Sequence, residues 1–208
     1  MTDEKMQTLK DDIAFMKALA QEGSATPLLF GGNMVAAGLI FGLASVGHWM
    51  IATGLLAVSE WGFLFNWLGA AAVFGVVCTL LVRRASKRPG FSAGVNRATG
   101  SAWSGVGFAI LAMWMGMMAY SYRTGHWEVM NIFPTVIFAL YGAAWMVAGD
   151  MSGKLWIKLT ALGSFAAAVG MGFLSGINEQ MLGYAACLFL LAVVPGLILM
   201  RQEPTDIV

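Results

Sequence analysis

The sequence has few charged residues for its length. Only 11% of its 208 residues are Asp, Glu, Lys or Arg, whereas 59% are hydrophobic. A soluble domain carries about 25% charged residues, because polar side chains must cover its core. A surface this poor in charge suits a lipid bilayer, which requires no polar covering. The net charge of +1 also excludes the strongly basic field that attracts nucleic acid, so we expect no nucleic-acid partner.

Ionisable residues are missing from the middle of every long apolar segment. Pumps, ion-coupled transporters and hydrolases that act within the membrane place such residues at depth, because charge movement and proton transfer require them there. Here Glu60, Arg123 and Asp150 fall at the predicted ends of segments. We therefore expect a non-enzymatic protein with no catalytic residue.

Six apolar segments are each long enough to cross a bilayer, which takes about 20 helical residues. The predicted fold is all-α: a polytopic membrane protein whose six transmembrane helices cover about residues 27–49, 62–82, 102–122, 129–147, 155–174 and 181–200. They form one domain at residues 25–202. A cytoplasmic amphipathic helix is predicted before it, at residues 1–24, and a short cytoplasmic tail after it, at residues 203–208.

The distribution of Lys and Arg predicts the orientation. Of the twelve such residues, only Arg123 falls in a connection on one side; the other eleven fall on the side that holds both termini. Lys and Arg are retained on the cytoplasmic side of membrane proteins. We predict a multi-pass protein of a bacterial inner membrane with both termini cytoplasmic. Trp103 and Trp145 fall near the inner interface, where indole rings prefer to lie.

The sequence contains only two cysteines, Cys78 and Cys187. In this topology Cys78 lies near the inner end of the second span and Cys187 in the outer half of the sixth. A disulfide requires Cα atoms less than about 7 Å apart, so these depths exclude one. Both are predicted to be small apolar thiols within the bundle.

The first 22 residues have the pattern of an amphipathic helix. Met6, Leu9, Ile13 and Met16 recur at helical spacing among Lys and Asp residues. Such a helix either lies on the membrane surface or binds a cytoplasmic protein partner. The membrane surface is the favoured interpretation, and three acidic residues near its start weaken binding to anionic lipid.

A weak repeat suggests that the six spans form three antiparallel hairpins. The second, fourth and sixth spans contain Leu68-Gly-Ala-Ala, Tyr141-Gly-Ala-Ala and Gly183-Tyr-Ala-Ala, and Gly-His-Trp follows the first and third spans. Chance similarity in a sequence rich in Gly and Ala is the alternative, and the stronger one.

The two histidines, His48 and His126, both fall at the predicted outer edge. If the hairpins pack side by side, the imidazoles come close enough to bind haem or copper, with the thioethers of Met113 and Met117 on one face of the third span. The alternative is that the histidines are polar interface residues and the methionines fill a helix–helix seam. The alternative is favoured, so no cofactor is expected.

Polar and small residues within the spans indicate helix packing. Asn33 and Asn66 are predicted to bond neighbouring helices, with ligand binding as the less favoured interpretation. Gly38-x-x-x-Gly42 and the glycines at 172 and 176 allow close approach, either within the chain or in a homo-oligomer. Pro195 is expected to bend the last span.

The longest connection, at residues 83–101, is strongly basic. Its first part sets the topology, and it is also a candidate for binding anionic lipid headgroups. The candidate headgroup-binding residues are Arg83, Arg84, Lys87 and Arg88.

Three functions are compatible with this sequence. The favoured one is a small regulatory or accessory subunit that acts through a partner, because the spans are nearly free of polar groups while the N-terminal helix is polar. The second is a carrier or substrate-binding subunit for a small uncharged molecule, since six short-looped helices resemble in outline the substrate-binding subunits of energy-coupling vitamin transporters. The third is a haem- or copper-binding protein that uses His48 and His126.

Overall fold

The computed structural model describes residues 26–59 and 61–203, together with Lys5, Gln7, Lys10, Asp12 and Ile13. Six helices in the described residues are long and apolar enough to cross a membrane. This confirms the prediction of an all-α polytopic membrane protein. The five isolated residues near the N-terminus are helical and exposed. The rest of the predicted amphipathic helix lies outside the described residues.

The observed helices follow the predicted spans closely. The first four spans are α2 (Gly31–Ala52), α3 (Trp61–Ala85), α4 (Gly94–Thr124), and a short 3-10 turn η1 (Trp127–Ile132) continued by α5 (Phe133–Ser152). The fifth is α6 (Leu155–Phe173). The sixth consists of α7 (Gln180–Leu188), a π-helical turn η2 (Phe189–Val193) and α8 (Val194–Arg201).

The largest difference from the prediction lies at the start of α4. The apolar pattern placed this span at residues 102–122, but the helix begins at Gly94. Its first two turns contain Asn96, Arg97 and Thr99, which hydropathy excludes from a span. The helix continues through them because backbone hydrogen bonds stabilise a helix whose side chains are polar as well as one whose side chains are apolar. The connection after α3 is correspondingly shorter.

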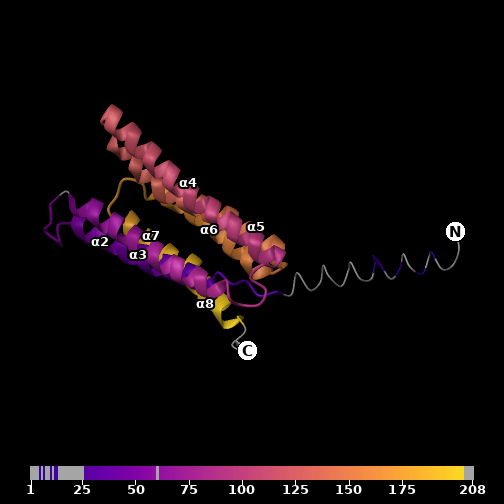
Figure 1. Ribbon diagram of the computed structural model, residues 1–208. Helices are drawn as coiled ribbons and strands as arrows, with labels where there is room; N and C mark the ends of the chain where they lie inside the picture. The colour runs from indigo at the N-terminus through magenta and orange to yellow at the C-terminus, as the bar shows by residue number, and fades with distance from the viewer. Residues whose placement is uncertain are drawn as a thin grey trace.

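The helices form two layers (Figure 1). One layer contains α2, α3 and the last span; the other contains α4, α5 and α6. In the first layer α2 lies between α3 and the last span, and in the second α5 packs on both α4 and α6. As a result α3 and α4 are edge helices. α3 has no buried residue, and α4 has only four.

The three predicted hairpins do not pack in the same way. α2 with α3, and α4 with α5, pack as neighbouring antiparallel pairs. The third pair is divided between the layers, because α6 packs mainly on α5 and the last span packs mainly on α2. The sequence similarity among the second, fourth and sixth spans therefore does not extend to equivalent packing of three hairpins.

The two layers meet in an aromatic cluster. Trp145 of α5 packs against Phe30 and Trp103, with ring centroids 5.6 and 5.4 Å apart. Tyr141 meets the Trp103 ring edge-on at 5.1 Å. Trp145 has no exposed surface, and Trp103 packs against the same core. The aromatic rings therefore join the layers, and the depth of Trp103 and Trp145 in the membrane stays a prediction.

Glycines allow the backbones of α2 and the last span to touch. A Cβ atom on Gly31 would lie 2.7 Å from the carbonyl oxygen of Gly196, and one on Gly38 would lie 3.1 Å from that of Leu188. The predicted close approach at Gly38 thus occurs within the chain. The contact at Gly42 is looser, because a Cβ atom there would lie 3.9 Å from Ala185 O. The contact of Gly31 with α8 also places the start of α2 and the end of the last span at the same end of the bundle.

The predicted close approach at Gly172 and Gly176 does not occur. The nearest neighbour of a Cβ atom at either position lies 4.0 Å away, which is ordinary van der Waals contact. Gly176 lies after the end of α6 and has φ +88°. This left-handed conformation is readily adopted only by glycine, so this residue serves the turn between α6 and α7.

Pro195 changes the last span in a specific way. Proline has no N–H group and crowds the carbonyl four residues earlier, here that of Leu191. The helix widens over Phe189–Val193, where the N–H of Val194 bonds to Phe189 O. The indole Nε1 of Trp145 donates a hydrogen bond to Leu191 O, 3.0 Å away. The Trp145 side chain therefore satisfies the Leu191 carbonyl, which the proline leaves without its helical donor.

Candidate functional sites at the two ends of the bundle

His48, near the end of α2, is held by α3. Its Nδ1 atom accepts a hydrogen bond from Trp67 Nε1, 3.0 Å away. Its ring also packs on Phe63, with centroids 4.7 Å apart. An imidazole nitrogen that accepts a hydrogen bond is not available as a metal ligand. This geometry favours a packing role for His48 between the first two spans.

His126 has a different environment, in the connection between α4 and η1. Its Nδ1 lies 3.9 Å from Glu128 Oε2, and both side chains are exposed. No described contact joins His126 to His48. Met113 and Met117 lie within α4, before His126 in the chain. Met113 precedes the end of the helix by 11 residues, or about 16 Å. The structure does not bring the four proposed ligands together.

No other metal-ligand cluster replaces them in the described part of the chain. Within it, no group of three or more His, Cys, Asp or Glu side chains lies close enough to hold a metal ion. Cys78 and Cys187 are both free and half-buried. The geometry therefore gives no support to the haem or copper hypothesis.

Asn66 connects α3 to α2, as the favoured interpretation predicted. Its Nδ2 donates to the carbonyl of Ala44 at 2.8 Å. Its Oδ1 lies 2.8 Å from the position that a Cβ atom on Gly47 would occupy, so the glycine makes room for the amide. Asn33, in contrast, makes no side-chain hydrogen bond within the described residues, and its backbone N–H bonds to Phe30 O at 3.1 Å.

Several Ser and Thr hydroxyl groups within the spans bond to their own helix. Ser45 Oγ donates to Phe41 O at 2.6 Å, and Ser164 Oγ donates to Thr160 O at 2.9 Å. Such bonds to the preceding turn satisfy the hydroxyl without a partner helix or ligand. These hydroxyls therefore do not form a polar binding site within the membrane.

Gln180 joins three elements at the end of the bundle that carries the histidines. Its side chain is 2% exposed, and Nε2 donates to Asn131 O at 2.8 Å and to Met171 O at 3.0 Å. It links α7 to η1 and to the end of α6. No sequence pattern predicts this role, because a lone Gln at a helix start is usually solvated.

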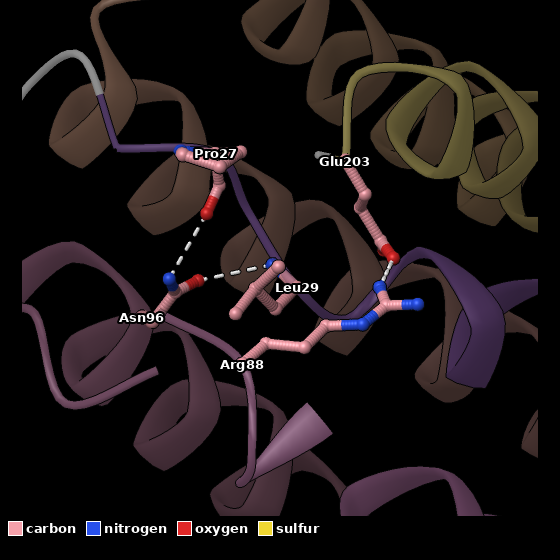
Figure 2. A network of polar contacts seen from close by, with 5 residues as sticks. All are labelled: Pro27, Leu29, Arg88, Asn96 and Glu203. Atoms are coloured by element: carbon pink, nitrogen blue, oxygen red, sulfur yellow. Dashed lines mark hydrogen bonds and ion pairs between the residues drawn. The ribbon is translucent and has the colours of Figure 1, made fainter. Parts of the chain in front are cut away.

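Asn96 is the centre of a network at the opposite end (Figure 2). Its Oδ1 accepts from the N–H of Leu29 at 3.1 Å, and its Nδ2 donates to Pro27 O at 3.0 Å and Gly90 O at 2.9 Å. One side chain thus holds together the segment before α2, the α3–α4 connection and α4. Sequence reasoning missed it because it placed residue 96 in a loop.

Two further contacts hold the end of the last span. Arg88 of the α3–α4 connection forms an ion pair with Glu203 (Figure 2). Lys154, in the α5–α6 turn, donates to Gln202 Oε1 at 2.5 Å, and burial lowers the pKa of its ammonium group. Arg88 is therefore engaged within the protein. Of the four predicted headgroup residues, Arg83, Arg84 and Lys87 are the exposed ones.

Replacing Asn96 by alanine should destabilise the protein by about 1–2 kcal/mol, because three hydrogen bonds are lost and their backbone partners keep less complete pairing. Thermal unfolding of the purified protein in a mild detergent measures this. Asn33→Ala is the matched control, since its amide makes no hydrogen bond to a described residue. Equal melting temperatures for the two variants would contradict the role assigned to Asn96.

Small residues follow the exposed face of α4. Ser101, Gly105, Ala112, Gly116 and Ala119 are all exposed and lie on one face at helical spacing, and the exposed ring of Phe108 lies at the edge of this face. A Cβ atom on Gly105 or Gly116 would meet no atom within 4 Å. An apolar hollow of about 250 Å³ between α4 and α5 includes Gly105. We call these five residues the α4 small-residue face.

The chain matches no known protein-family model, no curated protein and no solved structure.

Proposed function

We propose that this chain is a non-enzymatic accessory or regulatory subunit that binds a transmembrane helix of a partner protein along the α4 small-residue face. The observation that carries the proposal is that this face is uncovered. In membranes, small residues mark helix–helix interfaces, because they let backbones approach and gain van der Waals contact. Inside this chain, Gly31 and Gly38 already serve that purpose against the last span.

The length of the face matches that of a partner helix. Ala119 follows Ser101 by 18 positions, which corresponds to about 27 Å of helix. The hydrocarbon core of a bilayer is about 30 Å thick, so a helix lying along this face contacts it through the whole core. The hollow beside Gly105 gives room for a larger side chain of such a helix.

The proposal includes an orientation. Arg83, Arg97, Lys154 and Arg201 all lie at the end of the bundle where α2 begins and the last span ends, whereas Arg123 closes α4 at the other end. By the preference of Lys and Arg for the cytoplasm, the first end faces the cytoplasm of a bacterial cell and the membrane is the inner membrane. The segment at residues 1–22 then lies on the cytoplasmic side, where it offers a second contact for the partner.

A photo-reactive amino acid at Ala112, in the middle of the α4 small-residue face, tests the proposal in cells. We expect one cross-linked product that contains a different protein. Gly116→Leu should lower its yield at least ten-fold, because the larger side chain separates the helices. Gly69→Leu is the matched control: Gly69 lies on α3, and its Cβ position is equally open.

Two results would overturn the proposal. A product with twice the mass of the chain would show that a second copy covers the face, so that the protein is a homo-oligomer. The absence of any protein product, with unchanged folding of the labelled chain, would show that the face contacts only lipid.

A further inference from the structure

A second uncovered surface lies on α3 and has a different shape. A shallow hollow of about 440 Å³ lies along the exposed side of this helix, with Ala72 at one end, Gly75 and Val76 near its middle and Arg83 at the other end. A Cβ atom on Gly75 would meet no atom within 4 Å. The hydroxyl of Thr79, also in the hollow, donates to Gly75 O at 2.8 Å. Apart from the arginine, the surface therefore offers only apolar contacts.

The end of the hollow is cationic. Arg83, Arg84 and Lys87 are exposed, and no ion pair links them to an acidic side chain in the described part of the chain. In this they differ from Arg88, which is paired with Glu203. An apolar surface that ends at unpaired cations suits an acyl chain that carries an anionic headgroup.

We infer that the hollow on α3 binds one anionic phospholipid, with an acyl chain along Ala72, Gly75 and Thr79 and the phosphate at Arg83. Arg84 and Lys87 strengthen the attraction, since a basic residue near an anionic membrane surface contributes about 1 kcal/mol. The site lies on the first layer of helices, away from the α4 small-residue face, and does not depend on the proposed partner.

The length of the hollow favours a lipid over a partner helix. Arg83 follows Ala72 by 11 positions, or about 16 Å of helix. This is close to half of a hydrocarbon core of about 30 Å, which is the depth of one leaflet. A partner helix would need a contact surface through both leaflets, as α4 offers. A lipid needs only the leaflet in which its headgroup lies.

Native mass spectrometry of the full chain, titrated with dioleoyl phosphatidylglycerol or dioleoyl phosphatidylcholine, tests this inference. The two lipids share their acyl chains and differ in headgroup charge. We expect one phosphatidylglycerol to remain bound with at least ten-fold preference over phosphatidylcholine. Arg83→Gln should lower the preference about five-fold, the loss of one basic residue's contribution of about 1 kcal/mol. Gly75→Leu, which fills the hollow, should weaken retention of both lipids.

Two matched variants control for general effects. Arg123→Gln removes an exposed arginine from the other end of the bundle, and Gly107→Leu fills an equally open glycine position on α4. Both should bind phosphatidylglycerol like the unchanged chain. Equal retention of the two lipids by the unchanged chain would overturn the inference, because it would indicate surrounding bilayer lipid only. An unaltered preference in Arg83→Gln would overturn it as well.

Discussion

Replacing either Gly31 or Gly196 by alanine is expected to destabilise the protein by at least about 2 kcal/mol, the cost of forcing extra volume into a packed contact. A Cβ atom on Gly31 would lie 2.7 Å from Gly196 O and 2.9 Å from Met200 N; one on Gly196 would lie 2.7 Å from Gly31 O. These neighbours are backbone atoms, which cannot rotate away. The helices must separate, and they then lose contact along their length.

The two substitutions should also interact. The same separation of α2 from the last span relieves both clashes. The double variant should therefore lose clearly less stability than the sum of the losses in the two single variants. Unfolding in mixed detergent, followed by circular dichroism, measures all three. Gly69→Ala on α3 is the control, because its Cβ position has no neighbour within 4 Å. A loss of equal size in this control would show that the effect does not come from the helix contact.

The spans were predictable because a bilayer imposes a strict length of apolar helix. Six segments met that length, and all six are helices long and apolar enough to cross it. The failure at α4 has the same origin: hydropathy detects the part of a helix that suits lipid and misses a polar continuation such as the turn that contains Asn96.

The packing of the spans was less predictable, since lipid tails are as apolar as the interior of the bundle. Hydrophobicity therefore does not distinguish the exposed face of α3 from the buried face of α5. Small residues supplied part of the missing information. Gly38 was correctly expected at a close contact, whereas Gly172 and Gly176 have the same spacing and make none.

Trp145 shows how an indole ring can be satisfied inside the bundle. An indole ring has an apolar body and one N–H group that needs an acceptor, which usually places it at the membrane surface. In this protein the carbonyl of Leu191 provides that acceptor in the core. The carbonyl is free because of Pro195, so the position of Trp145 depends on a residue 50 positions further along the sequence.

Trp145→Phe should destabilise the protein by about 2–3 kcal/mol: a hydrogen bond within a membrane protein contributes about 0.6 kcal/mol on average and up to about 1.7, and the smaller ring leaves unfilled space in a fully buried site. Trp127→Phe is the control, since the Trp127 side chain is 52% exposed. Unfolding in mixed detergent measures the difference.

The role of Pro195 separates the hydrogen bond from the packing loss. Pro195→Ala restores an N–H four residues after Leu191, so the helix itself can satisfy the Leu191 carbonyl and the π-helical turn is no longer required. In that background Trp145→Phe should lose only the packing contribution and cost about 1 kcal/mol less than in the unchanged chain. If Trp145→Phe lowers the stability by the same amount in both backgrounds, the indole does not replace the donor that proline removes. Trp145 then stabilises the bundle only by filling space between its two layers.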